Sequence, residues 1–222
     1  INEIWEKYRI RLSESNVSGW VRGLHSPYNG RYIPAIDLLR PSEELAYLIG
    51  VKLGDGYVTK KRVSKKAIIG LRVKDREFAA EFARCLTTIL GRRPLKPKYR
   101  KYLGLYEVKV GSWTLYELLK KPVELNKLKK YIEHCERCIS AFLRGFVDAE
   151  GCVNKSGYID ISNTDIVLLK YVKGLLQRLG VIVTGPNSNR IKGKVFSNPK
   201  TGKRHTYNKN CYSIHIRVSS NM

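Results

Sequence analysis

Two segments decide the fold of this chain, LIGVKLGDG at residues 48–56 and LRGFVDAEG at residues 143–151. Each closes a stretch that we expect to be helical. Each also has two small residues four positions apart on one helix face: Gly50 and Gly54 in the first, Gly145 and Ala149 in the second. Glycine inside a helix lowers helix stability by about 1 kcal/mol relative to alanine, so its presence at these positions needs an explanation. Two helices that cross on their small-residue strips would supply it, and we expect that crossing.

Each segment carries an acid directly before its last glycine, Asp55 in the first and Glu150 in the second. A carboxylate is disfavoured at the negative C-terminal end of a helix dipole, and two neighbouring carboxylates repel each other. A crossing of the two helices therefore predicts a cation between the acids. Magnesium binds carboxylate and carbonyl oxygens and bridges to phosphate oxygens, which favours the hydrolysis of phosphodiesters.

The surroundings of both segments repeat in the same order. In the first half the periodicity and the end signals predict a helix over 42–55, a basic loop at 57–61, a strand over 67–74, a helix from Asp75 to Gly91, a strand over 105–112 and a short helix over 113–121. In the second half they predict a helix that ends at Gly151, a strand over 158–163, a helix that ends at Gly180, and a long hairpin of 190–196 with 211–218 around the turn 197–203. The chain is thus expected to contain two copies of one structural repeat.

We expect four parts along the chain: an N-terminal extension 1–40, a first half 41–121, a polar linker 122–138 and a second half 139–222. The second half ends where the first half continues into a helix, so its last helix is expected to be missing. The extension is rich in aromatic and basic residues. We expect it to pack over the first half, with contact to nucleic acid as the open alternative.

The net charge of +23 points to a polyanionic partner, and nucleic acid is the expected one. An anionic membrane would call for a basic amphipathic helix, whereas the cations here lie mostly in loops and alternating segments. Three acid-free basic runs, Lys60–Lys66, Arg92–Lys101 and Arg190–Lys209, are expected as loops. The five scattered cysteines and the lack of a signal peptide or long apolar run predict an intracellular, cytoplasmic protein.

The doubled segment resembles the LAGLIDADG homing endonucleases, a family named for this helix. LRGFVDAEG matches closely, while LIGVKLGDG keeps the glycines and the acid but has Leu53 where the first Asp of the motif stands. The resemblance covers about residues 42–218. It implies an α+β fold of two pseudo-symmetric αββαββα halves, with the motif helices at the interface and two antiparallel sheets that form a saddle over DNA.

The resemblance also implies an activity: a monomeric, intron-encoded enzyme, without a protein partner, that cuts both strands of a long non-palindromic duplex across the minor groove. Two or three Mg²⁺ ions would be shared by Asp55, Glu150 and the main-chain oxygens of Gly54 and Ala149. The family often has one basic residue in each half near the scissile phosphates. Lys74 fits that place in the first half. The matching place in the second half is near Thr164, which is not basic, so Lys155 is a stand-in candidate.

Strand alternation places basic side chains on polar faces that are suited to phosphates and base edges, or simply to solvent. These residues are Arg72, Lys74, Lys109, Arg190, Lys192, Lys194, His215 and Arg217. In the hairpin, Arg190, Lys192 and Lys194 are expected to share one strand face. The basic loops add Lys60, Lys61, Arg62, Lys203 and Arg204 to the expected DNA-binding set.

Two other functions stay open at this point. Some proteins of this family bind intron RNA as splicing cofactors (maturases), and the same scaffold also serves DNA-binding regulators. Retention of both acids favours cleavage. Cys135 and Cys138 form a Cys-x-x-Cys pair with His134 beside it, but zinc sites generally use two more ligands at matching spacing. The sequence therefore argues against a zinc site.

Overall fold

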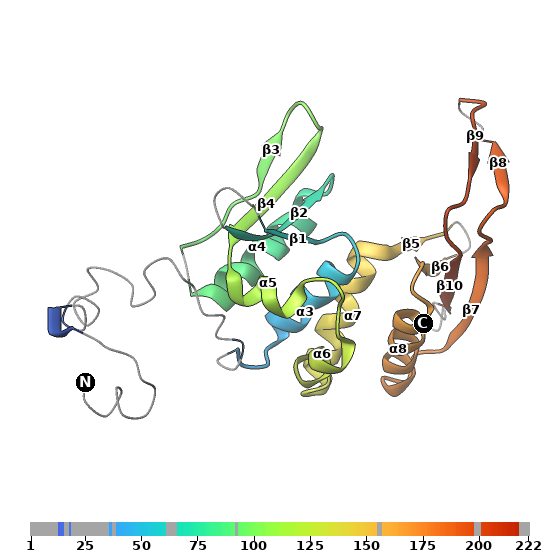
Figure 1. The fold of residues 1–222 in the computed structure, drawn as a ribbon. Coiled ribbons are helices and arrows are strands. Elements are labelled where there is room, and N and C mark those ends of the chain that lie inside the picture. The colour runs from blue at the N-terminus through green and yellow to red at the C-terminus, as the bar shows by residue number, and fades with distance from the viewer. Residues whose placement is uncertain are drawn as a thin grey trace.

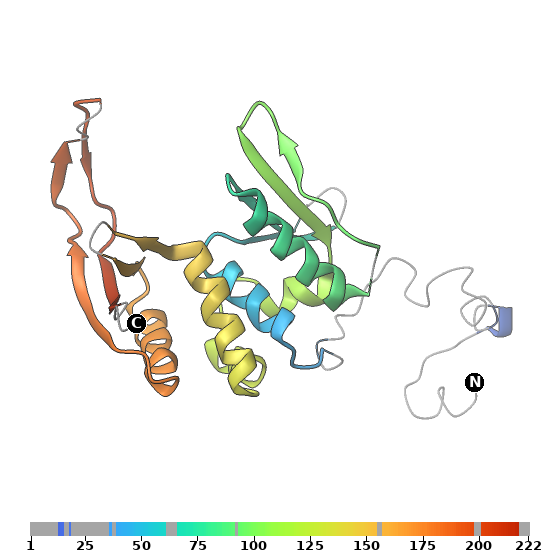
Figure 2. The ribbon, with the colours of Figure 1, turned by 180° about the vertical axis from the view of Figure 1, so that it is seen from behind.

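The computed structural model describes residues 13–15, 18, 36, 39–60, 66–91, 93–154, 157–197 and 201–217. Two helices cross at the centre, and a four-stranded antiparallel sheet lies on either side of them (Figure 1). Seen from behind, the two sheets still flank the central pair (Figure 2). This is the predicted α+β architecture of two repeated halves. In the described part of the chain, no helix is long and apolar enough to cross a bilayer.

The first half contains α3 (Glu43–Leu53), β1 (Tyr57–Lys60), β2 (Ala67–Val73), α4 (Arg76–Leu90), β3 (Lys98–Arg100), β4 (Leu105–Gly111) and α5 (Trp113–Leu119). The hydroxyl of Ser42 caps α3, and the carboxylate of Asp75 caps α4 at 2.9 Å from the Phe78 nitrogen. Gly91 ends α4 in the left-handed conformation, at φ 56°. The predicted starts of both helices and the end of α4 are therefore confirmed, whereas α3 ends at Leu53, two residues before the predicted limit.

The second half contains α7 (Glu136–Glu150), β5 (Gly151–Val153), β6 (Tyr158–Asn163), α8 (Ile166–Arg178), β7 (Val183–Arg190), β8 (Val195–Ser197), β9 (Arg204–Thr206) and β10 (Cys211–Arg217), and α6 (Leu125–Ile132) precedes it. The strand order is β1-β2-β4-β3 in the first sheet and β5-β6-β10-β7 in the second. When only the strands of each four-stranded sheet are counted, the two orders are the same, because β8 and β9 form a separate hairpin. The repeat in the sequence is therefore a repeat in topology.

The two motif helices, α3 and α7, approach each other backbone to backbone at their glycines. A Cβ atom added at Gly50 would lie 2.2 Å from the Phe142 carbonyl oxygen, and one at Gly145 would lie 2.3 Å from the Tyr47 carbonyl oxygen. The Tyr47 hydroxyl also donates to the Asp148 carboxylate at 2.8 Å. The predicted crossing on small-residue strips is confirmed, and only glycine fits at these two positions.

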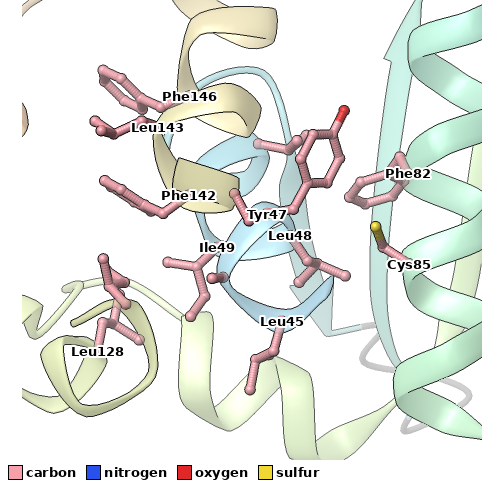
Figure 3. Close-up of a cluster of buried hydrophobic side chains, with 14 of the residues drawn as sticks. Leu45, Tyr47, Leu48, Ile49, Phe82, Cys85, Leu128, Phe142, Leu143 and Phe146 are labelled. Carbon is pink, nitrogen blue, oxygen red and sulfur yellow. The ribbon is translucent and has the colours of Figure 1, made fainter. Parts of the chain in front are cut away.

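The crossing makes one hydrophobic core out of both halves. Figure 3 shows Tyr47, Leu48 and Ile49 of α3 between Phe82 of α4 on one side and Phe142 of α7 on the other. All of these side chains are buried. Close packing through the helix pair therefore holds the two sheets in one arrangement.

Three stretches expected as loop or linker contain regular structure. Residues 57–60 form β1, paired with β2, and 98–100 form β3, an edge strand with little apolar content. The linker contains α6, in which Leu128, Tyr131 and Ile132 are buried. Their spacing with Leu125 is helical and could have been recognised. The Tyr131 hydroxyl donates to the carbonyl of Ile36, so this residue of the proposed extension lies against α6.

The expected hairpin of 190–196 with 211–218 is wrong in its first strand. β10 pairs instead with β7, which begins at Val183 and contains Pro186. Proline is tolerated there because β7 is an edge strand and its pairing with β10 shifts register twice. Lys192 and Lys194 do not share a strand face with Arg190, because the chain turns at Ile191–Lys194 with Gly193 at φ 86°. A separate hairpin, β8 with β9, follows, and residues 218–222 lie outside the described part.

Candidate active site

The two acids lie where the crossing helices end. Gly54 is the C-cap of α3 and Asp55 follows it, while Glu150 is the last residue of α7 and leads directly into β5. A Cβ atom at Gly54 would lie 2.6 Å from the Ala149 Cβ and 2.9 Å from the Glu150 Cγ. The residue before one acid therefore packs against the side chain of the other.

Electrostatics at this place disfavour two negative charges. Burial and the charge of Asp55 raise the pKa of Glu150 to about 7, against an opposing hydrogen bond from Asn163 at 3.1 Å. Burial also raises the pKa of Asp55. A divalent cation bound between the two carboxylates would offset their burial and the repulsion of Glu150 by Asp55. The carbonyl groups in the last turn of a helix are not used by its own ladder, and Gly54 and Ala149 lie in such turns. The donor set therefore fits a hard cation such as Mg²⁺.

A polar pocket of about 500 Å³ adjoins Glu150 in the second half. His215 Nδ1 lies 2.7 Å from the Asp160 carboxylate, which also accepts from Asn154 at 3.0 Å. The hydrogen bond from His215 lowers the pKa of Asp160. His215 was predicted on a polar strand face, whereas its partner Asp160 and the Glu150 partner Asn163 were not singled out. The alternation of YIDISN could have indicated Asp160, since its neighbours Ile159 and Ile161 face the core.

The polar face of the first sheet is organised around one buried acid, Glu107, whose side chain is 4% exposed. It accepts from Arg72 Nε at 3.0 Å and Arg100 Nε at 2.8 Å, and Lys109 Nζ lies 3.2 Å away. Burial opposes ionisation of Glu107, but the hydrogen bonds from these three cations outweigh it and hold its pKa at about 2. Two of the predicted DNA-binding residues are thus held in place rather than free, which the sequence did not reveal.

The other predicted residues are placed as follows. Lys74 is exposed directly after β2, and Lys60 is exposed at the end of β1 with its ammonium 5.0 Å from the centre of the Trp113 ring. Arg190 lies over the Tyr207 ring at 5.5 Å. Five more are exposed on β10, on the second hairpin or on the turns beside it: Lys192, Lys194, Lys203, Arg204 and Arg217. Lys61, Arg62 and Lys155 lie outside the described residues.

A wider groove of about 1100 Å³ opens between the halves, and it is lined by Lys52, Lys60, Lys120, Lys121 and Lys209. Lys52 belongs to the first motif helix and is 5% exposed. Burial and the charge of Lys121 lower its pKa to about 8. The sequence did not single out this lysine, because it stands in an otherwise apolar helical segment.

We expect Lys52→Met to stabilise the protein at pH 7 by about 1–2 kcal/mol, after allowance for the groove that opens beside Lys52. The folded pKa of Lys52, about 8, lies below its ordinary value of 10.5, so the unfolded chain binds the extra proton between these pH values. The charged Lys52 therefore lowers the free energy of unfolding by its full amount below pH 8, and this loss decreases as the pH rises to about 10.5. Urea unfolding at pH 7 and pH 10 measures this, with exposed Lys170→Met as control. Lower stability of Lys52→Met at pH 7 would contradict it.

A repeated αββαββ unit with glycine-lined helices at its interface and an acid at each helix end defines a two-motif protein of the LAGLIDADG type. Residues 42–121 and 137–221 both match the LAGLIDADG-like domain family. The chain therefore belongs to this family.

Two relatives come from Methanocaldococcus jannaschii. The uncharacterized protein MJ0398 is 31% identical over 198 residues, which are 84% of this chain and 68% of the relative. The uncharacterized protein MJ0314 is 35% identical over 153 residues, 64% of this chain and 57% of the relative.

Solved structures of the homing endonuclease I-DmoI share the fold. Mesophilic variants of I-DmoI align with a TM-score of 0.52 and 23% identity, over 79% of this chain and 89% of theirs. I-DmoI in complex with DNA and Mn aligns with a TM-score of 0.51 and 23% identity, over the same shares of the two chains.

Proposed function

We propose that this protein is a site-specific, metal-dependent endonuclease that cuts both strands of duplex DNA and promotes the mobility of an intron. The observation that carries the proposal is the placement of Asp55 and Glu150 together at the ends of crossing helices, with their pKa values raised. Such a pair is poor as a structural device and suited to a divalent cation. The family membership and the DNA complexes of I-DmoI support the same function.

In this proposal the carboxylates of Asp55 and Glu150, with the main-chain oxygens of Gly54 and Ala149, hold Mg²⁺. The metal supplies Lewis-acid activation of a phosphate and of the attacking water. Asn163 orients the Glu150 carboxylate through its hydrogen bond. Lys74 contributes the positive charge near the scissile phosphates in the first half, and Lys155 is the proposed residue for this role in the second half.

The two reading faces differ in chemistry, which supports one chain on one non-palindromic site. The first sheet presents cations fixed by Glu107, whereas the second presents the His215–Asp160 pair and a row of serine and asparagine side chains. Fixed guanidinium groups are suited to phosphates and guanine edges. We therefore propose a monomer whose two halves bind different half-sites. The extension 1–40 and the linker 122–138 are the two other proposed parts of the chain.

Cleavage of a genomic duplex library that includes intron-free exon junctions tests this function. In Mg²⁺ or Mn²⁺, we expect cuts of both strands at one site class and none with EDTA. A parallel experiment measures binding of the protein to the RNA of the introns that interrupt those junctions. Tight binding of that RNA, together with no cleavage of any duplex in either metal, would replace the endonuclease by the splicing cofactor.

A further inference from the structure

Three metal-ligating side chains gather at the far end of α7 from Glu150. His134 lies in the turn after α6, Cys135 is the N-cap of α7, and Cys138 is in its first turn. Their ligand atoms all lie within 4.8 Å of one another, and the two sulfur atoms are 3.4 Å apart. His134 and Cys135 are exposed, whereas Cys138 is buried. The group is therefore reachable from solvent but anchored in the core.

Although the sequence spacing alone argued against zinc, we propose from this geometry that His134, Cys135 and Cys138 form a site for one soft divalent cation such as Zn²⁺, with water as the fourth ligand. Zinc binds thiolate sulfur at about 2.3 Å and imidazole nitrogen at about 2.0–2.1 Å, so two thiolates on one tetrahedral ion lie roughly 3.8 Å apart, and a thiolate and an imidazole roughly 3.6 Å apart. The two observed sulfur atoms, 3.4 Å apart, are slightly closer than that. Only small side-chain movements are needed to close the site around an ion.

The chemistry of the two thiols supports the site. The pKa of Cys135 is lowered to about 7 by His134, by the backbone N–H of Cys138 and by the Cys138 thiol. Burial and the neighbouring Cys135 sulfur raise the pKa of Cys138 to about 11. As the pH rises above about 7, the pair therefore loses the Cys135 proton and keeps the Cys138 proton. A divalent ion displaces that proton, and two thiolates neutralise its charge.

One acid and one arginine lie beside the site. Glu43, at the start of α3, acts on Cys138 with its negative charge, and it lies 4.0 Å from the guanidinium of Arg137. A bound ion would fasten the turn after α6 to the first turn of α7, and so hold one end of the interface helix.

The proposed ion is distinct from the one between Asp55 and Glu150. The 15 residues of α7 separate the two places by about 22 Å at 1.5 Å per residue. Thiolate and imidazole prefer soft ions, whereas paired carboxylates prefer Mg²⁺. Magnesium should therefore not compete for the cysteine site.

Titration of the fully reduced chain with Co²⁺ tests the proposal. We expect one cobalt ion per chain, with a thiolate-to-cobalt charge-transfer band and the visible bands of tetrahedral cobalt, displaced by equimolar Zn²⁺ and unaffected by excess Mg²⁺. Cys135→Ser and Cys138→Ser should each lose the charge-transfer intensity or the stoichiometric binding, and His134→Ala should weaken binding at least about tenfold. The controls Cys152→Ser and Cys211→Ser should behave as the unmodified chain does.

Two outcomes would overturn the proposal. One is an unchanged cobalt spectrum in Cys135→Ser, whose side chain is exposed and whose replacement should leave the core intact. The other is a reduced chain that takes up neither Co²⁺ nor Zn²⁺ but joins Cys135 to Cys138 on mild oxidation. Cys135 and Cys138 would then form a redox-active dithiol, and the three residues would not form a metal site.

Discussion

Asp55→Asn and Glu150→Gln are each expected to abolish DNA cleavage and to leave specific DNA binding intact. Both variants keep the shape and hydrogen-bonding capacity of the side chain but remove the charge that a metal needs. Loss of one electrostatic group that acts in the transition state lowers rates by about 10²–10³-fold, and loss of the metal should exceed that. Binding should stay or tighten, because one of two repelling carboxylates facing a polyanion is gone.

The matched control is Asp148→Asn, on the same helix as Glu150. Asp148 accepts a hydrogen bond from the Tyr47 hydroxyl, and an amide oxygen can still accept it. We therefore expect this variant to cleave DNA normally. A gel shift and a cleavage assay on all three variants decide the matter. Full cutting by Asp55→Asn in Mg²⁺ would end the catalytic assignment.

The raised pKa of Glu150 also predicts how the stability of Glu150→Gln depends on pH. Its folded pKa, about 7, lies above the ordinary value of 4.5, so the folded protein binds the extra proton between these pH values. Without metal, this group destabilises the fold progressively as the pH rises from about 4.5 to 7. Glu150→Gln should therefore be more stable than the unmodified chain at pH 8 in EDTA, by on the order of 1–2 kcal/mol, with no difference at pH 4. A purely structural role for Glu150 predicts lower stability instead.

Gly50→Ala and Gly145→Ala are each expected to destabilise the protein by about 2–4 kcal/mol, at the upper end of the range for overpacked cores. The added methyl groups would lie 2.2 Å and 2.3 Å from backbone carbonyl oxygens, which cannot rotate away as a side chain could. The two helices would have to separate, and the shared core would open with them. Midpoints of urea unfolding measure the loss.

Gly174→Ala is the control for these variants. Gly174 lies in α8, and an added Cβ would meet nothing within 4 Å. Alanine is the better helix former by about 1 kcal/mol, so this variant should be slightly more stable. Equal behaviour of the substitutions at Gly50 and Gly174 would contradict the role of glycine at the interface.

Much of the fold could be predicted from local signals. The caps Ser42 and Asp75 and the terminal Gly91 mark helix limits that are confirmed, and the apolar positions of β2 and β10 face the core as their alternation predicts. Helix α6 was missed although its apolar spacing is helical, but two missed strands lack such signals. β3 and β7 are edge strands of polar sequence. β3 is stabilised by pairing with β4, which follows it directly, and β7 by pairing with β10 further along the chain. Their strand conformation depends on partners and not on their own periodicity.

The sequence by itself determined the doubled half, the crossing on glycines and the pairing of Asp55 with Glu150, because these follow from short-range patterns written twice. Only the tertiary structure decided the electrostatic state of the residues that matter. Burial and the charge of Asp55 raise the pKa of Glu150, and burial and the charge of Lys121 lower the pKa of Lys52. Glu107 accepts hydrogen bonds from Arg72 and Arg100 on neighbouring strands. Burial and charge interactions act between residues that are brought together by folding, over distances of a few ångströms that sequence separation does not reveal.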